Sequence, residues 1–216
     1  KTLGIHTPEL FTEYDENDVE SIANNVQYPV VIKAKSGVGV SKGLRYANNK
    51  QELIHYYNEV NSFQSKTGAS NYESPMIQEF IPGFIHDACT LTNHGCVVAI
   101  LTQRRHLMYP IYGGVGAVNV TTHDKKLAEL ARRLLEEIKW HGPAQVEFKF
   151  DERDKTYKLI ELNPKLCGTL DLSIRVGFNF PAMIRDILLG ERFIPPDHYP
   201  EGVRYKFIFP QAANAY

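Results

Sequence analysis

The sequence has no excess of either charge and no long apolar run. A net charge of -1 at pH 7 and scattered Lys and Arg residues exclude the basic stripe typical of a nucleic-acid-binding protein. No apolar stretch approaches the ~20 residues of a membrane-spanning helix, so we expect no membrane partner. The 216 residues are 43% hydrophobic and 23% charged, which predicts a globular protein with a substantial core. The chain begins at Lys1 without Met, so we expect further sequence upstream.

Cysteine is scarce, and the three residues present, Cys89, Cys96 and Cys167, show no CxxC spacing. An odd number without that spacing indicates neither a disulfide framework nor a zinc site. We therefore expect a reducing compartment and a cytoplasmic location. Cys89 and Cys96 lie in apolar runs, which predicts that both are buried.

Apolar periodicity predicts strands and helices that alternate in groups along the chain. The clearest helix is expected over residues 125–140, with one apolar stripe, whereas residues 109–118 form a glycine-rich stretch without a predicted strand. Asn93, His94 and Gly95 separate two alternating runs and predict a tight hairpin turn. This order favours an α+β fold with two lobes, residues 1–82 and 83–216, over a parallel doubly wound sheet.

A predicted hairpin over residues 145–150 and 157–163 organises the second lobe. Alternation places three polar residues, Glu147, Glu161 and Asn163, on one face of this hairpin. The opposite face is expected to carry the apolar residues Val146, Phe148, Phe150, Ile160 and Leu162. Two carboxylates about 5 Å apart repel each other by roughly 3 kcal/mol at an effective dielectric near 20, so a partner is needed. Mg²⁺ prefers such an oxygen set, although a solvated face with cross-strand salt bridges fits equally well.

A second candidate site is the loop from Lys33 to Gly43, which combines glycines with lysines. Successive backbone N–H groups in such a loop form a concavity that binds anions, and the ammonium groups add charge. The loop matches neither GxxxxGK[ST] nor GxGxxG. The glycines and lysines thus predict a phosphate-binding loop, and because neither motif is present, an ordinary hairpin tip is the alternative.

Residues 75–83 lead from a predicted strand into a Pro-Gly turn. Backbone groups at such a boundary can bind a flat apolar ligand. The alternative interpretation is an edge strand that ends at the turn.

Four segments occur in a fixed order, namely VVIKAKSGVGVSKG, MIQEFIPG, AQVEFKF and LIELNPKLCG. Together they resemble the ATP-grasp superfamily, nearest to its carbamoyl-phosphate-synthase-like ligases, over about residues 1–190. The resemblance implies two lobes, each with an antiparallel sheet and packed helices, and a nucleotide bound between them. It also implies ATP and Mg²⁺ as cofactors, with Mn²⁺ as an alternative metal.

The resemblance assigns roles to individual residues of this sequence. Lys33 is similar to the strand lysine that contacts nucleotide phosphates, and residues 35–42 are similar to the mobile lid over them. The implied nucleotide-binding residues are Lys33, Lys35, Gly37, Gly39, Lys42, Gln78, Glu79, Phe80 and Ile81. The implied metal ligands are Glu147, Glu161 and Asn163, the same trio that alternation places on one face.

Two further positions bear on the chemistry. Lys165 stands where the family usually has Arg in an NPR motif, so a phosphate contact there would come from a point charge rather than a fork. If the lobes pack as in the family, Arg104 and Arg105 lie beside the metal, and either can hold a substrate carboxylate. The expected catalytic residues are thus Lys33, Lys165 and Arg104. An exposed strand edge is the alternative for the arginine pair.

The leading hypothesis is an ATP- and Mg²⁺-dependent ligase that forms a carbon-nitrogen bond. It activates a small-molecule carboxylate as an acyl phosphate, which a small-molecule amine then attacks. The alternatives are a non-catalytic ATP-binding regulatory module and a phosphotransferase that acts on a hydroxyl. Part of the substrate site is expected from an upstream domain that this chain lacks.

Overall fold

A computed structural model of the chain describes residues 3–11, 19–35, 43–66, 74–109 and 115–207. The chain divides into two compact units. The smaller unit contains Pro8–Ile81 with Pro110–Val115, and the larger unit contains Lys1–Thr7, Pro82–Tyr109 and Gly116–Tyr216. The lobe boundary expected after residue 82 remains a prediction. Among the helices in the described ranges, none is long and apolar enough to cross a membrane.

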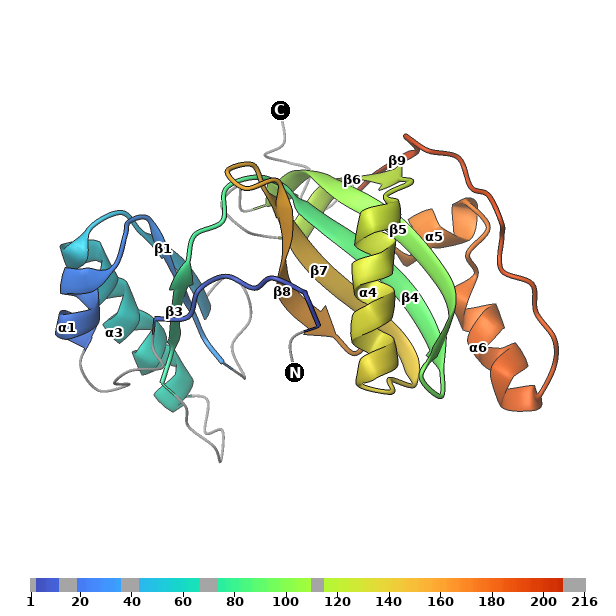
Figure 1. Ribbon diagram of the computed structural model, residues 1–216, viewed down its shortest axis with the longest axis horizontal. Coiled ribbons are helices and arrows are strands. Elements are labelled where there is room, and N and C mark those ends of the chain that lie inside the picture. The colour runs from blue at the N-terminus through green and yellow to red at the C-terminus, as the bar shows by residue number, and fades with distance from the viewer. Residues whose placement is uncertain (1–2, 12–18, 36–42, 67–73, 110–114, 208–216) are drawn as a thin grey trace. The chain divides into compact units, whose positions relative to one another are not determined.

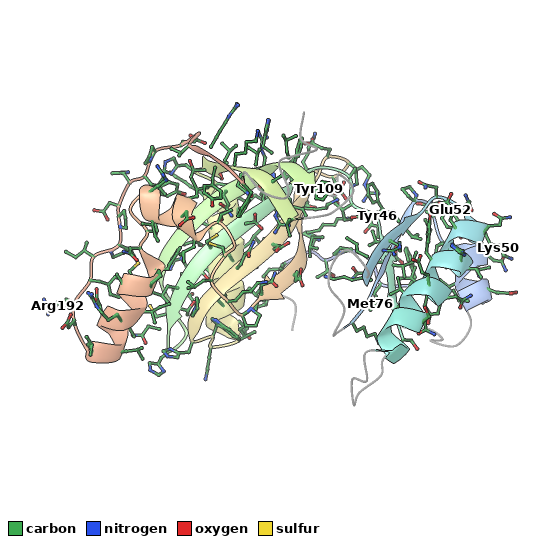
Figure 2. The ribbon with its side chains drawn as sticks, turned by 180° about the vertical axis from the view of Figure 1, so that it is seen from behind. Tyr46, Lys50, Glu52, Met76, Tyr109 and Arg192 are labelled. Atoms are coloured by element: carbon green, nitrogen blue, oxygen red, sulfur yellow. The ribbon has the colours of Figure 1, made fainter. Side chains whose placement is uncertain are left out.

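The smaller unit is a three-stranded antiparallel sheet covered by two helices (Figure 1). The strand order is β2-β1-β3, with β1 at Val30–Lys33, β2 at Leu44–Ala47 and β3 at Met76–Glu79. The helices are α1 at Val19–Asn25 and α3 at Lys50–Lys66. Figure 2 shows Tyr46 and Met76 on the strands of this unit, and Lys50 and Glu52 at the start of α3. The core consists of Ala23, Val30, Ile32, Ala47, Leu53, Tyr57, Val60 and Ile77.

The larger unit is built on a six-stranded sheet with the order β8-β7-β4-β5-β6-β9. The strands are β4 Ile85–Asn93, β5 Cys96–Tyr109, β6 Val115–Thr122, β7 Gly142–Asp151, β8 Thr156–Asn163 and β9 Arg204–Lys206. The pairs β4–β5, β4–β7, β7–β8 and β6–β9 are antiparallel. The predicted turn between β4 and β5 is confirmed, because His94 and Gly95 both have positive φ, at 45° and 82°. The two antiparallel sheets with packed helices confirm the predicted α+β class.

Helices cover both faces of the six-stranded sheet (Figure 1). Helix α4, Lys125–Glu137, packs on one face, and Leu127, Leu130, Ala131 and Leu135 bury its apolar stripe. Burial of each leucine stabilises the fold by roughly 1.5–3 kcal/mol. Helices α5, Leu170–Arg175, and α6, Phe180–Leu189, pack on the opposite face. Along each strand, successive side chains therefore alternate between an α4 face and an α5 face.

Helix α4 begins as the sequence predicts and ends earlier. The side chain of Asp124 accepts a hydrogen bond from the backbone N–H of Leu127 at 2.8 Å, so Asp124 is the N-cap. The helix ends at Glu137, and Lys139 with a φ of 51° turns the chain before the predicted end at Trp140. The predicted apolar stripe is confirmed, whereas the prediction that the helix continues to residue 140 is wrong.

Three further expectations differ from the structure. Residues 115–122 form strand β6, although the glycine-rich sequence indicated no strand there. A shift of register after Glu147 leaves Ile160 without a partner on β7, so Leu159 packs on the apolar face in place of Ile160, while Leu162 lies there as predicted. Cys96 lies at the start of β5 and is exposed, whereas Cys89 is buried as expected.

Candidate functional site

The acidic residues of the predicted hairpin meet on the α5 face of β7 and β8. Glu147 on β7 lies directly opposite Glu161 on β8, and Asn163 lies opposite Gln145. The Nδ2 of Asn163 donates a hydrogen bond to Oε1 of Glu147 at 3.1 Å. Glu147 is only 7% exposed, while Glu161 faces solvent. The predicted juxtaposition of the trio is therefore present in the structure.

Arg105 on β5 connects this trio to a second buried carboxylate. Its Nη2 lies 2.6 Å from Oε1 of Glu147 and 2.8 Å from Oδ1 of Asp87. Its Nε donates to Oδ2 of Asp87 at 3.2 Å. Asp87 on β4 is completely buried and also accepts a hydrogen bond from Nε2 of Gln145 at 2.9 Å. One guanidinium thus offsets two buried negative charges.

The network extends to the start of α5 through Gln103. Its Nε2 donates to the hydroxyl of Thr169 at 2.8 Å, and that hydroxyl donates to Oε1 of Gln103 at 3.0 Å. Thr169 immediately precedes α5, so this reciprocal pair ties the helix to the central strands. Buried polar groups that are all hydrogen-bonded hold a fixed arrangement.

The electrostatics of the site centre on Glu147. The pKa of Glu147 is raised to about 7, chiefly by burial, with Asp87 and Glu161 acting in the same direction and Arg105 opposing them. Burial also disfavours the charged form of Arg105, but Asp87 and Glu147 outweigh it and raise the pKa of the guanidinium. A cation placed between Glu147 and Glu161 would stabilise the ionised form of both carboxylates.

The donor set fits a hard divalent cation. Two opposed carboxylates and an amide oxygen are ligands that Mg²⁺ prefers, with water or phosphate oxygens to complete the shell. The amide of Asn163 directs its nitrogen to Glu147, so binding through its oxygen requires the amide to turn. Within the described ranges, no group of three or more His, Cys, Asp and Glu residues is arranged for a metal.

Arg104 does not lie beside the trio as the sequence suggested, and the phosphate contact expected of Lys165 remains a prediction. Arg104 follows the alternation of β5 onto the α4 face, where its guanidinium lies 5.2 Å from the ring centre of Phe84. Arg105 is therefore the arginine that reaches Glu147. Lys165 lies just beyond β8 and is exposed, and its backbone N–H donates to the carbonyl of Asn163 at 2.8 Å.

The predicted nucleotide residues belong to the smaller unit. Lys33 is the last residue of β1 and is half-buried, opposite Leu44 and Met76. Lys35 is also half-buried, and Gly37, Gly39 and Lys42 lie outside the described residues.

Residues 78–81 run along the edge strand β3 and past its end. The backbone N–H of Glu79 donates to the carbonyl of Glu9 at 2.9 Å, and its carboxylate accepts from the N–H of Glu9 at 3.2 Å. The N-terminal segment therefore contacts this edge, where an isolated bridge also joins Leu10 to Gln78. Phe80 packs edge-on against Tyr46 at 5.8 Å, and Ile81 is buried.

Sequence reasoning missed four members of the network, namely Asp87, Gln103, Gln145 and Thr169. Asp87 interrupts an apolar strand, and an acid inside such a run signals a buried partner. Gln103 and Gln145 likewise interrupt apolar alternation, but only the pairing of β4 with β5 and β7 brings them together.

Comparisons with known proteins give the chain a family. Residues 73–208 match the model of the family described as "ATP-grasp in the biosynthetic pathway with Ter operon". Biotin carboxylase 1 of Bacillus subtilis is 25% identical over 152 residues, which are 68% of this chain and 33% of that protein. The carbamoyl phosphate synthase large chain of Pyrococcus furiosus is 25% identical over 79% of this chain and 16% of its own length.

Solved structures agree with these matches at the level of the fold. The biotin carboxylase domain of Hydrogenobacter thermophilus 2-oxoglutarate carboxylase, solved with magnesium ADP and bicarbonate, covers 94% of this chain with a TM-score of 0.74 and 19% identity. The alignment spans 46% of that solved chain, so this chain corresponds to part of a larger protein in each comparison. The family match spans more than half of the sequence, and the chain belongs to the ATP-grasp family.

Proposed function

We propose that the protein is an ATP- and Mg²⁺-dependent ligase that activates a carboxylate for attack by an amine. The observation that carries this proposal is the direct opposition of Glu147 and Glu161, with Asn163 bonded to Glu147. Two opposed carboxylates repel each other, and a bound metal would offset that repulsion in addition to Arg105, which supports a site kept for binding. The biotin carboxylase relatives were solved with ATP-type nucleotides, one of them with magnesium.

In this proposal Glu147, Glu161 and Asn163 hold the metal, with Mn²⁺ as an alternative to Mg²⁺. Bound there, the metal would neutralise negative charge on the phosphates of ATP. Arg105 keeps Glu147 in position through its contacts with Glu147 and Asp87, so we assign it a positioning role. This role replaces the substrate contact expected of Arg104, which lies on the other face of the sheet.

The bond changes follow from the proposed reaction class. A carboxylate oxygen of the substrate attacks the γ-phosphorus of ATP, and ADP leaves. The amine then attacks the acyl carbon and loses a proton to solvent, and inorganic phosphate leaves with the electron pair of the broken C–O bond. Lys33 and Lys165 would bind phosphate oxygens through their ammonium groups, and Lys35 and Gln78 to Ile81 would contact the nucleotide. Placement and charge neutralisation then supply the catalysis, without a protein nucleophile.

The proposed substrates are a small-molecule carboxylate and a small-molecule amine. The name of the relative biotin carboxylase indicates carboxylation of biotin, and that of the structural neighbour N5-carboxyaminoimidazole ribonucleotide synthetase indicates a carboxyl group on nitrogen. We also propose a cytoplasmic location, which the buried free thiols of Cys89 and Cys167 support.

The test is an ADP- and phosphate-release assay with pools of carboxylates and amines. We expect release that requires Mg²⁺ and both pools, that Glu147→Gln abolishes, and that Glu129→Gln, a change of an exposed α4 glutamate, leaves intact. Nucleotide binding without release would contradict a ligase and favour a regulatory module. ADP formation with a phosphorylated alcohol and no free phosphate would instead favour the phosphotransferase.

A further inference from the structure

A pocket of about 480 Å³ lies on the α4 face of the larger unit, away from the acidic trio. Its lining residues are Phe84, His86, Arg104, Asp124, Lys126, Phe150, Glu152 and Tyr157. Arg104 faces this pocket, while Arg105, the next residue of β5, faces Glu147 on the opposite side of the sheet. The volume falls within the range of sites that bind small molecules.

The two acids that line the pocket already have partners in the protein. One carboxylate oxygen of Asp124 accepts from the backbone N–H of Leu127, and the other accepts from the hydroxyl of Tyr157. Glu152 forms an ion pair with Lys155 at 2.6 Å. Neither carboxylate is therefore arranged to attract a cationic ligand.

Unlike the two acids, the two cations that line the pocket, Arg104 and Lys126, have unmet interactions. The Nε of Arg104 is buried and has no hydrogen-bond partner. Among the described residues, no carboxylate forms a salt bridge with Arg104 or with Lys126. A buried donor is normally hydrogen-bonded, so the unsatisfied Nε points to a missing acceptor. The formal charges of the four charged lining side chains sum to zero, but the two cations, unlike Glu152, have no oppositely charged partner at salt-bridge distance among the described residues.

The remaining lining is aromatic. Phe84 is 49% exposed, which is unusual for so large an apolar side chain. The guanidinium of Arg104 lies over one face of its ring. Phe150 and Tyr157 lie edge to face with ring centres 5.1 Å apart. Burial lowers the pKa of His86 although Asp124 acts in the other direction, so its neutral ring adds to the aromatic lining near neutral pH. Flat apolar ligands pack favourably against such rings.

We propose that this pocket binds a small aromatic carboxylate. The ligand's carboxylate pairs with the guanidinium of Arg104, whose side chain turns to present the buried Nε, and with the ammonium of Lys126. Its ring packs against Phe84, Phe150 and Tyr157. The anion supplies the acceptor that Arg104 lacks, and the planar ring covers the exposed face of Phe84. The site is separate from the acidic trio, because β4, β5 and β7 lie between the two faces of the sheet.

The test compares three probes by calorimetry on the full chain. 2-Naphthoate offers both a ring and a negative charge, 2-naphthamide offers the ring without the charge, and inorganic phosphate offers the charge without the ring. We expect 2-naphthoate to bind at least about tenfold more tightly than either of the others, because both kinds of contact are used. It should also shift the NMR signal of the His86 ring.

Two variants and a matched control identify the residues. Arg104→Gln and Lys126→Gln should each weaken 2-naphthoate binding by about tenfold. Lys125→Gln removes the same charge one residue away, outside the pocket lining, and should change the affinity less than about twofold. If Arg104→Gln fails to fold, the affinity of Lys126→Gln for 2-naphthoate tests the proposal, because Lys126 is exposed on α4 and its substitution should leave the fold intact. Absent binding, equal affinity for the amide, or unchanged affinity in Lys126→Gln would overturn the proposal.

Discussion

Arg105 holds Glu147 at 2.6 Å and Asp87 at 2.8 Å with the same Nη2 atom. Asp87 is completely buried and Glu147 is 7% exposed, so neither carboxylate can turn to water if the guanidinium is removed. Arg105 is thus both a structural partner of Asp87 and the residue that fixes one of the proposed metal ligands.

Arg105→Met should lower the free energy of unfolding by roughly 3–5 kcal/mol, because it leaves two buried acids without their counter-charge. The measurement is denaturant unfolding without nucleotide or metal. Arg104→Met is the matched control on the next residue of the same strand. Arg104 has no salt-bridge partner among the described carboxylates, so its loss should cost less than about 1 kcal/mol. Equal effects of the two substitutions would contradict the network.

Stability should depend on pH through Glu147. Burial raises its folded-state pKa to about 7, above the value of about 4.3 in an unfolded chain, so folding favours the protonated acid. Its contribution is therefore fully present below pH ~4.3 and is lost as pH rises toward 7. Glu147→Gln should flatten the fall in stability over this interval, whereas Glu129→Gln should retain it. Parallel pH profiles for the wild-type protein and Glu147→Gln would show that Glu147 titrates normally.

Gly83 is a position where only glycine fits. Its φ is +104°, and an added Cβ would lie 2.5 Å from the carbonyl oxygen of Phe150. Gly83→Ala should cost more than the roughly 1–3 kcal/mol of backbone strain alone, because the strand carbonyl must also move. Gly202→Ala is the control, since Gly202 has a φ of +80° with no atom within 4 Å of the added Cβ. Thermal melting that shows equal losses would exclude the close approach to Phe150.

Lys33 tests the nucleotide site in the smaller unit. The register places Glu79 opposite Val30 and Lys33 opposite Met76, so the two charges lie at opposite ends of the strand pair. We predict that Lys33→Met retains thermal stability and weakens ATP binding by roughly 1–3 kcal/mol, the value of a charge-assisted contact. Lys50→Met, in the same unit, removes a half-buried lysine bonded to Asn24 and should leave ATP binding unchanged. A lowered melting temperature with normal ATP binding would assign Lys33 a structural role instead.

The central hairpin was predictable because alternation is a local property. One buried face fixes the parity of both strands, and Glu147, Glu161 and Asn163 followed from it. The register shift at Ile160 was not predictable, because apolar residues on both sides of the shift satisfy the same pattern.

Strand β6 and the choice between Arg104 and Arg105 depend on neighbours distant in sequence. The glycines before β6 suggest a loop, and only its place in the sheet beside β5 and β9 makes the segment extended. A pair of adjacent arginines does not reveal which one faces the site until β5 is paired with β4, where Gln103 lies opposite Asp87.

The most direct test of the proposed site is a calorimetric titration of Mg·ATP into Glu161→Gln. This change removes one exposed carboxylate of the pair and keeps the side-chain size, so the fold should be retained. We predict an Mg·ATP affinity at least about tenfold weaker than that of the wild-type protein, since even indirect partners of metal ligands typically contribute 10–100-fold. Glu129→Gln should bind like the wild-type protein. Unchanged Mg·ATP affinity in Glu161→Gln would contradict the assignment of the acidic pair as the metal site.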